Sequence, residues 1–370
     1  MNNVKNILHK FNFKGEMVDI QPFGAGHINK TYIATYKRED GTIKQYVVQQ
    51  VNSTVFKNID TLMENVFAVT SFLRQRIKEN GGDSERETLH YIKTSDGDKY
   101  YFDGENYYRA YVFVDKSISY NSVDDAEIFK SSGAAFGKFQ RYLADFPAET
   151  LTETIPNFHD TKWRYDNEFV PAVENNLSGR KDTCLDEIQF VMDRKEDTSL
   201  LVDLIEQGEL PIRVTHNDTK LNNVLFDKES DKGICVIDLD TIMPGLSLYD
   251  FGDSIRSGAN TGAEDATDLS TVSLSLPMFA AYADGYLSQQ AKTLTQAELD
   301  HLAFSARYIT FEQVLRFLMD YINGDTYYKI KSPLHNLERT HAQYALLQSI
   351  EAQSEAMCEI IRNTTAKYRA

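Results

Sequence analysis

The sequence predicts an α+β fold in two lobes, a small β-rich lobe with one long helix and a larger, mainly helical lobe. Alternating apolar and polar residues separated by turn signals fill residues 1–115, whereas helical periodicity dominates residues 116–370. The length points the same way, because single hydrophobic cores stop growing at roughly 250 to 300 residues and this chain has 370. We therefore expect a domain boundary close to residue 115.

The composition argues against several classes of partner. The formal net charge is −16, whereas nucleic-acid binding begins with basic residues that neutralise phosphates. The three cysteines are far apart and form no CxxC pattern, which argues against a disulfide framework or a zinc site. No segment approaches the ~20 apolar residues of a membrane span, and the amino terminus lacks the apolar run of a signal peptide. We expect a cytoplasmic protein that binds neither nucleic acid nor membrane.

The amino-terminal lobe begins with three predicted strands, at residues 17–23, 31–37 and 44–51. The last two are joined across Asp40-Gly41, and Asp-Gly between alternating apolar segments is a strong hairpin signal. We therefore expect an antiparallel β-hairpin at the start of the chain.

One long helix is predicted at residues 58–82, where Leu62, Val66, Val69 and Leu73 recur at helical spacing. Short alternating segments bounded by turn signals follow this helix. They predict three further strands, at residues 89–94, 99–102 and 106–114.

The carboxyl-terminal lobe is predicted to follow a short hinge near residues 113–116. Its first helix covers residues 126–146 and stops before Pro147, and most of the remaining chain is helical, apart from a β-like interruption at 212–241. A long amphipathic helix is expected from Leu337 to the end of the chain. Such an apolar face packs against its own lobe more often than against a second copy, so we expect a monomer or a weak homodimer.

A glycine-rich loop lies between the first two predicted strands. Residues 24–31, GAGHINKT, nearly match the phosphate-binding pattern G-x-x-x-x-G-K-[ST], but that pattern needs a following helix and here a strand continues. A glycine-rich strand-turn-strand over ATP phosphates is the kinase arrangement, which makes Gly24 and Gly26 candidates for phosphate binding. The simpler interpretation is an ordinary turn, and His27 in the same loop is either structural or faces a ligand.

The densest polar cluster lies in the β-like interruption. Residues 212–227, IRVTHNDTKLNNVLFD, begin and end as apolar segments, and Asp238 follows eleven residues later in a strand-like stretch. Converging carboxylates repel one another unless a cation neutralises them, and Mg²⁺ prefers hard oxygen ligands together with substrate phosphates. Asp218 is then the residue that orients or accepts the substrate hydroxyl proton, while Asn223 and Asp238 hold the magnesium ion.

These residues resemble a known signature. HNDTKLNN at residues 216–223 is similar to the H-x-D-x-x-x-x-N motif of the aminoglycoside phosphotransferase and choline kinase superfamily, and Ile-Asp-Leu at 237–239 is similar to its I-D-F metal motif. The resemblance implies a bilobal, protein-kinase-like fold, ATP and Mg²⁺ as cofactors, and supporting roles for His216 and Asp250 beside the catalytic loop. The nucleotide-binding residues that it implies are Gly24, Gly26, Asn29, Gln49, Phe113 and Val114.

A second metal motif is rejected. Residues 250–252 read Asp-Phe-Gly, like the D-F-G metal motif of protein kinases. In the small-molecule kinases that this chain resembles, however, the metal carboxylate lies on the strand just after the catalytic loop, where Asp238 stands. Asp250 therefore matches the downstream aspartate that braces that loop.

The third strand lacks an expected cation. Kinases of this superfamily usually carry a Lys or Arg there to grip the nucleotide phosphates, whereas this chain has Gln49 and Gln50. Glu64, which resembles the usual helix partner of that cation, thereby loses its expected role. A nucleotide-binding protein without catalytic activity is one alternative, although the intact Asp218 argues against it.

The substrate is also suggested by resemblance. The whole motif set, spread over residues 16–340, is similar to the sugar 1-kinases of this superfamily, which implies transfer of the ATP γ-phosphate to the anomeric hydroxyl of an N-acetylhexosamine. The sugar-binding residues implied are His27, Asp218, Asp240, Arg316 and Tyr327. A kinase for another small alcohol, such as an amino alcohol, homoserine or an aminoglycoside, is the alternative. A cationic substrate would favour acidic residues around its amine, so Arg316 in the pocket would argue against it.

Overall fold

The computed structural model describes residues 2–24, 29–122 and 124–370. These residues form two compact units, each built from segments that are separated along the chain. The first unit comprises Met1–Ser119, Asp145–Ile155 and Val224–Met243, and the second comprises Tyr120–Ala144, Pro156–Asn223 and Pro244–Ala370. The expected α+β class is confirmed, because the first unit is rich in strands and the second is mainly helical.

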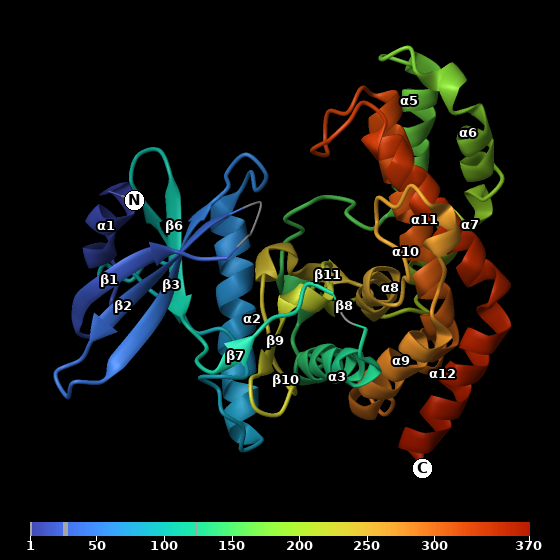
Figure 1. Cartoon of the computed structure of the whole chain (residues 1–370). Coiled ribbons are helices and arrows are strands. Elements are labelled where there is room, and N and C mark those ends of the chain that lie inside the picture. Colours follow the sequence, from blue (N-terminus) through green and yellow to red (C-terminus); the bar gives the residue numbers. More distant parts are fainter. Residues whose placement is uncertain (1, 25–28, 123) are drawn as a thin grey trace. The chain divides into compact units, whose positions relative to one another are not determined.

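The first unit contains a six-stranded antiparallel sheet (Figure 1). Its strands, in spatial order, are β1 (Glu16–Pro22), β2 (Lys30–Lys37), β3 (Ile43–Val51), β6 (Tyr107–Val112) and β4 (Tyr91–Ile92), with β5 (Tyr101–Phe102) also paired to β6. All six match predicted strands, but β4 and β5 form regular pairs over only two residues each.

The predicted hairpin joins β2 and β3. Thr42 donates its backbone N–H to the Asp40 carboxylate at 2.9 Å, and Gly41 adopts φ +83°, a left-handed conformation that favours glycine. This turn fixes the register in which Lys37 opposes Ile43 and Thr31 opposes Gln49. The turn at one end of the hairpin therefore determines which residue of β2 lies opposite Gln49 at the other end.

Helices pack on both faces of this sheet. The predicted long helix is α2 (Ile59–Glu79), which begins where the Asn58 side chain accepts a hydrogen bond from Thr61 N–H. A short helix that the sequence did not predict, α1 (Asn2–Ile7), continues as the 3-10 turn Leu8–Lys10 and packs on the Tyr46 side of the sheet. The two helices complete the core of the first unit.

A second, three-stranded sheet explains why later segments join the first unit. In it, β9 (Val224–Asp227) pairs with both β7 (Ser117–Ile118) and β10 (Gly233–Val236). The Asn65 amide on α2 also donates to the carbonyls of Thr152 and Ile242 at 2.8 and 3.0 Å. A single domain boundary at residue 115 therefore does not describe the first unit.

The second unit is built from helices around α10. Its main helices are α3 (Ala126–Tyr142), α4 (Thr161–Arg164), α5 (Val170–Asn175), α6 (Leu185–Met192), α7 (Lys195–Glu206), α8 (Ser247–Gly258), α9 (Leu276–Gln290), α10 (Gln296–Ile322), α11 (His335–Ala352) and α12 (Ser354–Arg369). A π-helical turn, Tyr165–Phe169, joins α4 to α5. A short strand, β8 (Arg213–Thr215), pairs with β11 (Met243–Gly245), where the chain enters this unit. Additional 3-10 turns occur at Lys181–Thr183, Leu221–Asn223 and Leu269–Thr271 in this unit, and at Ala148–Thr150 and Leu239–Thr241 in the first.

Glycines allow two pairs of these helices to approach closely. A Cβ on Gly285 of α9 would lie 1.9 Å from the Lys130 carbonyl oxygen of α3, and a Cβ on Gly252 of α8 would lie 2.3 Å from the Ser305 carbonyl oxygen of α10. Only glycine permits such backbone contact without moving the helices apart. Gly252 of the Asp-Phe-Gly tripeptide thus has a packing role.

The prediction of a single long helix at the carboxyl terminus is wrong. The helix starts at His335 and is interrupted at Gln353, where φ is −106° and ψ is 8°, so that α11 and α12 are separate. The Gln353 amide donates to the Leu274 carbonyl at 3.0 Å, and α12 then packs on α9. Among the described residues, no helix is long and apolar enough to cross a membrane.

Candidate active site

The predicted catalytic loop leaves β8 and is buried at its start. His216 and Thr219 are almost inaccessible to solvent, and Asn217 has φ +64°, in the left-handed region. The Asp218 N–H donates to His216 Nδ1 at 3.2 Å, and the His216 ring lies edge-on to Phe136 and packs in the core. The sharp turn turns the Asp218 side chain toward solvent, because its neighbours are held inside.

Asp250 of α8 braces this loop. Its carboxylate accepts hydrogen bonds from His216 N–H at 3.0 Å, Asn217 N–H at 2.8 Å and Gln140 Nε2 at 2.7 Å. Burial raises the pKa of Asp250, while nearby His216 and these three donors oppose the rise. The carboxylate thus satisfies two backbone groups of the loop that would otherwise be buried without partners.

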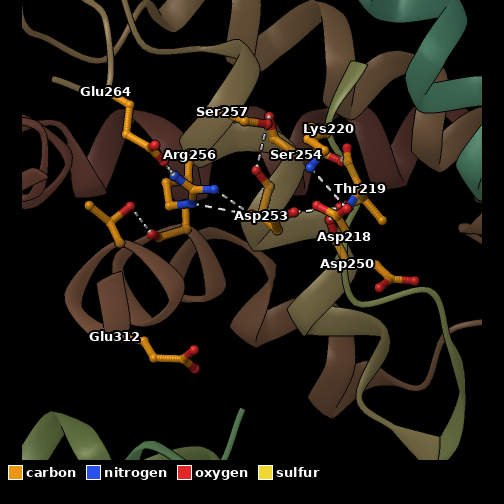
Figure 2. Close-up of polar contacts among 12 residues, drawn as sticks. Asp218, Thr219, Lys220, Asp250, Asp253, Ser254, Arg256, Ser257, Glu264 and Glu312 are labelled. Atoms are coloured by element: carbon orange, nitrogen blue, oxygen red, sulfur yellow. Dashed lines mark hydrogen bonds and ion pairs between the residues drawn. The ribbon is translucent and has the colours of Figure 1, made fainter. Parts of the chain in front are cut away.

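A second carboxylate of α8 holds the next residue. Asp253 accepts a hydrogen bond from Thr219 N–H at 2.8 Å and binds the Arg256 guanidinium, whose other end reaches Glu264 at 3.0 Å (Figure 2). Burial disfavours the charged carboxylate of Asp253, but Arg256 outweighs burial and lowers its pKa. The two aspartates of α8 therefore fix the backbone on both sides of Asp218.

Asp218 presents one unengaged oxygen. Its Oδ2 accepts a hydrogen bond from Asn223 Nδ2 at 3.1 Å and forms an ion pair with Lys220 Nζ at 3.0 Å, whereas no described residue donates to Oδ1. About 30% of the side chain is accessible, so a substrate hydroxyl can reach it. Because Asn223 uses its amide nitrogen for Asp218, its Oδ1 is the oxygen that it can offer to a cation.

Asp238 belongs to the first unit, unlike Asn223. It follows β10 and precedes the 3-10 turn Leu239–Thr241, with φ +61° in the left-handed region. Left-handed non-glycine residues store local strain and gather at functional sites. A carboxylate and an amide oxygen form a hard donor set that suits Mg²⁺ when substrate phosphates complete it. Among the described residues, no group of three or more His, Cys, Asp or Glu side chains forms a metal site.

Asp240 is the centre of a buried network within the first unit. Arg109 Nη1 donates to its Oδ1, and Asn29 Nδ2 donates to its Oδ2 at 2.7 Å. Arg109 also donates from Nε to Gln49 Oε1 at 2.9 Å, because the two residues lie directly opposite on β6 and β3. Asn29 further accepts from Asn52 N–H at 3.0 Å. Burial opposes the charge of Arg109, but Asp240 outweighs it and raises the pKa of Arg109.

This network places a charge pair, Arg109 with Asp240, beside the glutamine that stands where the third strand lacks a cation. Gln49 contributes no charge, but it holds Arg109, which is 1% exposed, in place. Glu64, by contrast, is mostly exposed and forms an ion pair with Lys99. The buried charge pair of this unit is therefore Arg109 with Asp240, and Glu64 takes no part in it.

The remaining nucleotide candidates lie at the ends of the sheet. Gly24 has φ +76°, and the Phe113 ring lies edge-on to Phe23. Val114 is buried, and its carbonyl accepts a hydrogen bond from Ser117 at 2.7 Å. Two further candidates, Gly26 and His27, lie outside the described residues.

Arg316 of α10 is enclosed by aromatic rings. Its guanidinium carbon lies 5.4 to 5.9 Å from the ring centroids of Phe158, Tyr327 and Tyr328. Tyr327 is 68% exposed, whereas Arg316 is nearly buried. Aromatic faces attract a guanidinium and hold it in one orientation. The loop that carries Tyr327 is held by Asp320, which accepts hydrogen bonds from three of its backbone amides.

Glu312 supports Arg316 from one helical turn earlier. It accepts hydrogen bonds from His159 Nδ1 at 3.0 Å, Thr161 Oγ1 at 3.3 Å and Arg316 Nη1 at 3.4 Å. Burial alone would raise the pKa of Glu312, but His159 and then Arg316 and Arg164 outweigh it and lower the pKa to about 2. Figure 2 shows Glu312 in the same region of the second unit as Asp218, Asp253 and Arg256.

Four residues of these networks were missed at the sequence level. Arg109, His159, Asp253 and Glu312 each bond to a partner far away in sequence or on another element. Asp253 had a usable signal, since it lies on the same helix face as Asp250, three residues on. Arg109 and Glu312 lie in apolar strand and helix patterns, and His159 lies in a turn, so the local sequence does not indicate the partner of any of the three.

Comparison with known proteins gives a consistent result. A family model described as a phosphotransferase enzyme family matches residues 19–284. Three solved structures resemble the chain over nearly its whole length. They are a microcompartment-associated aminopropanol kinase (15% identity, 96% of this chain and 98% of that one, TM-score 0.60), a choline kinase from Cryptosporidium parvum (11%, 94% and 93%, 0.55) and an amicoumacin kinase in complex with AMP-PNP and Ca²⁺ (13%, 96% and 93%, 0.52). At these identities the likeness concerns the fold, and it confirms the kinase-like fold that the sequence predicts.

Proposed function

The chain belongs to the phosphotransferase enzyme family, and on that basis we propose that it is an N-acetylhexosamine 1-kinase. The proposed reaction transfers the γ-phosphoryl group of ATP to the anomeric oxygen of N-acetylglucosamine or N-acetylgalactosamine, with Mg²⁺ present. The products are ADP and the sugar 1-phosphate. The observation that carries the proposal is Asp218, which offers a free Oδ1 from a loop braced by Asp250 and Asp253.

Asp218 would orient the anomeric hydroxyl and accept its proton at Oδ1 as the O–P bond forms and the bond to ADP breaks. Its second oxygen is already held by Asn223 and Lys220, so the free oxygen has a fixed direction. A positioned base of this kind contributes typically ~10²- to 10⁴-fold in rate.

Asn223 and Asp238 would hold the magnesium ion, through an amide oxygen and a carboxylate. The ion, when bound, neutralises charge on the phosphates and on the leaving ADP. In the first unit, Gly24, Asn29, Gln49, Phe113 and Val114, with Gly26, are the residues proposed to contact the nucleotide. Gln49 is also bonded to Arg109, whose charge is paired with the buried Asp240.

The charges around Arg316 favour an uncharged, hydroxyl-rich acceptor. Glu312 already accepts hydrogen bonds from His159 and Arg316, and Asp253 is paired with Arg256. Both of these acidic side chains thus already have cationic or hydrogen-bonding partners, whereas a substrate ammonium group would favour unpaired acidic side chains. Arg316 and Tyr327 instead offer donors and a ring face, which suit sugar hydroxyl and N-acetyl groups. Asp240 and His27 complete the proposed sugar contacts.

A kinase for another small alcohol is the second candidate, and the fold it shares with an aminopropanol kinase and a choline kinase supports it. An amino alcohol, homoserine or an aminoglycoside carries an ammonium group, whereas the sugar does not. The two candidates therefore predict opposite responses to a neutral variant of Arg316. For the sugar, Arg316→Met should raise KM by about tenfold or more, whereas a cationic substrate should bind no worse.

The experiment is a substrate panel assayed for ADP release with Mg-ATP. The panel contains both N-acetylhexosamines, 1-amino-2-propanol, choline, ethanolamine, homoserine and an aminoglycoside. We expect the highest kcat/KM for an N-acetylhexosamine, with an acid-labile 1-phosphate identified by ³¹P NMR. Turnover of an amino alcohol alone would replace the sugar proposal with the second candidate. No ADP release from any member would support a catalytically inactive nucleotide-binding protein.

A further inference from the structure

A cavity of about 800 Å³ opens in the first unit, beside the carboxyl-terminal half of α2. Helix α2 lines it from Phe67 to Glu79, and the start of β3 at Lys44 and the strand β4 provide further walls. None of the residues proposed above for ATP, magnesium or sugar lines this cavity. It is therefore separate from the proposed active-site residues.

The lining is strongly basic, although the whole chain carries a net charge of −16. Six cationic side chains and two acidic ones face the cavity. The cationic residues are Lys14, Arg38, Lys44, Arg74, Lys78 and Lys93, and the acidic ones are Glu79 and Glu85. An isolated patch of this sign in an acidic protein concentrates anions locally.

Most of these cations lack a counter-ion. Both acidic side chains are already occupied, Glu85 by Arg74 and His90, and Glu79 by Arg76. Among the described residues, no carboxylate lies within 4.0 Å of the charged groups of the other five cations, which are Lys14, Arg38, Lys44, Lys78 and Lys93. Like charges that share a cavity repel one another unless an anion joins them.

The floor of the cavity is apolar and partly aromatic. It is formed by the buried side chains of Tyr46, Phe67, Tyr91 and Val112. His90 lies beside this floor; burial lowers its pKa, and the neighbouring Arg74 and Lys44 lower it further. An apolar floor with a basic rim fits a ligand that combines a ring with charged groups.

We propose that this cavity binds an organic phosphate, with its ring or carbon skeleton on the aromatic floor and its phosphate groups between Lys44 and Lys93. Phosphate oxygens accept several charge-assisted hydrogen bonds, and lysine acts as a point charge for them. The side chains at the rim are open to solvent, so the site is accessible without unfolding. Because α2 and the sheet form opposite walls, an occupied site stabilises the packing of α2 on that sheet.

The test measures binding of inorganic pyrophosphate to the intact protein by isothermal titration calorimetry at low salt, with EDTA to remove divalent ions. The variant Lys44→Met/Lys93→Met should weaken binding at least about tenfold. The matched control Lys228→Met/Lys292→Met removes two exposed charges outside the cavity and should bind like the wild type. Binding by the wild type should also weaken as salt rises.

Separate arms identify the source of the phosphate. ADP, a sugar 1-phosphate and inorganic phosphate are titrated in the same buffer. The compound with the lowest Kd identifies the class of ligand. Steady-state KM for ATP should be unchanged in Lys44→Met/Lys93→Met, since neither lysine belongs to the proposed active site. If this variant weakened pyrophosphate binding and also raised the KM for ATP by a similar factor, the anion would belong to the active site. That result would overturn the proposal.

Direct labelling avoids dependence on the variant's folding. Pyridoxal 5′-phosphate followed by borohydride marks lysines beside an anion site, and peptide mass spectrometry locates them. We expect Lys44 and Lys93 to be labelled first and to be protected by pyrophosphate. Equal labelling of Lys228 and Lys292, or equal affinity of the double variant and the wild type, would contradict the cavity as a phosphate site.

Discussion

Asp218 illustrates how a reactive side chain is placed by its neighbours. Its own backbone N–H is bonded to His216, and the amides on either side are held by Asp250 and Asp253. Substitution by asparagine preserves these contacts but removes the base. We predict that Asp218→Asn lowers kcat at least ~10²-fold while the affinity for ADP changes less than about threefold.

Rapid-quench turnover and ADP titration measure the two quantities. Asp300→Asn, on the exposed side of α10, is the matched control and should retain full activity. Unchanged turnover in Asp218→Asn would remove this residue from the proposed mechanism.

The effect of Arg109 on stability depends on its partner, Asp240. With Asp240 it forms an ion pair that is almost inaccessible to water. Removal of one member of a buried pair leaves an uncompensated charge, which costs roughly 3 to 5 kcal/mol. We therefore predict that Arg109→Met lowers the free energy of unfolding by about that amount, measured by urea denaturation.

The double variant Arg109→Met/Asp240→Asn separates charge from packing. It should recover at least half of the lost stability, because no buried charge remains without a partner. Arg76→Met is the control in the same unit, since its ion pair with Asp145 is exposed and should be worth no more than about 1 kcal/mol. Equal losses in the single and double variants would show that packing, not charge, holds this site.

At the scale of elements, the contact between α3 and α9 depends on the absence of a side chain. Because a Cβ on Gly285 would overlap the Lys130 carbonyl oxygen, Gly285→Ala must move one helix away from the other. We predict a loss of at least about 2 kcal/mol, even though alanine favours a helix. Ala281→Gly, on a half-exposed position of α9, should cost only about 1 kcal/mol. Thermal denaturation compares the two, and a stabilised Gly285→Ala would refute the close contact.

The sequence predicted the elements whose cause is local. The β2–β3 hairpin follows from Asp40-Gly41, and α2 follows from apolar spacing after the Asn58 cap. The carboxyl-terminal helix was predicted without its break, because Gln353 is a good helix former and the bond that draws it to Leu274 is not visible in local sequence. Helix α1 was missed because six residues give too short a period to recognise.

The same division holds for the candidate site. Asp218 and Asn223 stand on one short loop, so their spacing is a local signal, and they do bond to each other. Arg109 and Asp240 are 131 residues apart, and only the pairing of β3 with β6 brings Arg109 beside the glutamine that replaced the expected lysine. Long-range pairing of this kind is decided by topology and cannot be read from spacing.

For the whole molecule, acid stability depends on carboxylates held in the charged form. The pKa of Glu312 is lowered to about 2 from 4.5, so its stabilising effect is complete above pH about 4.5 and is lost as the pH falls toward 2. We predict that stability declines in this window and that unfolding takes up close to one proton fewer in Glu312→Gln than in the wild type. The slope of unfolding free energy against pH measures that number.

Glu355→Gln is the control for this prediction, because Glu355 is exposed on α12. Its slope should equal that of the wild type between pH 5 and 2. Glu85 and Asp265 also have pKa values lowered to about 2, so a slope must remain in Glu312→Gln. An unchanged slope in that variant would contradict a charged, buried Glu312.

The assembly of the first unit from three separate stretches of chain has a consequence during synthesis. When the ribosome has released residues 1–119, β7 still lacks its neighbour and Arg109 lacks its counter-charge, since β9 and Asp240 belong to the stretch 224–243. The early strands of the nascent chain therefore remain incompletely packed until about 120 more residues emerge. At 5 to 20 residues per second this takes roughly 6 to 25 seconds. Fragments cut at the end of β6 should accordingly aggregate when expressed alone.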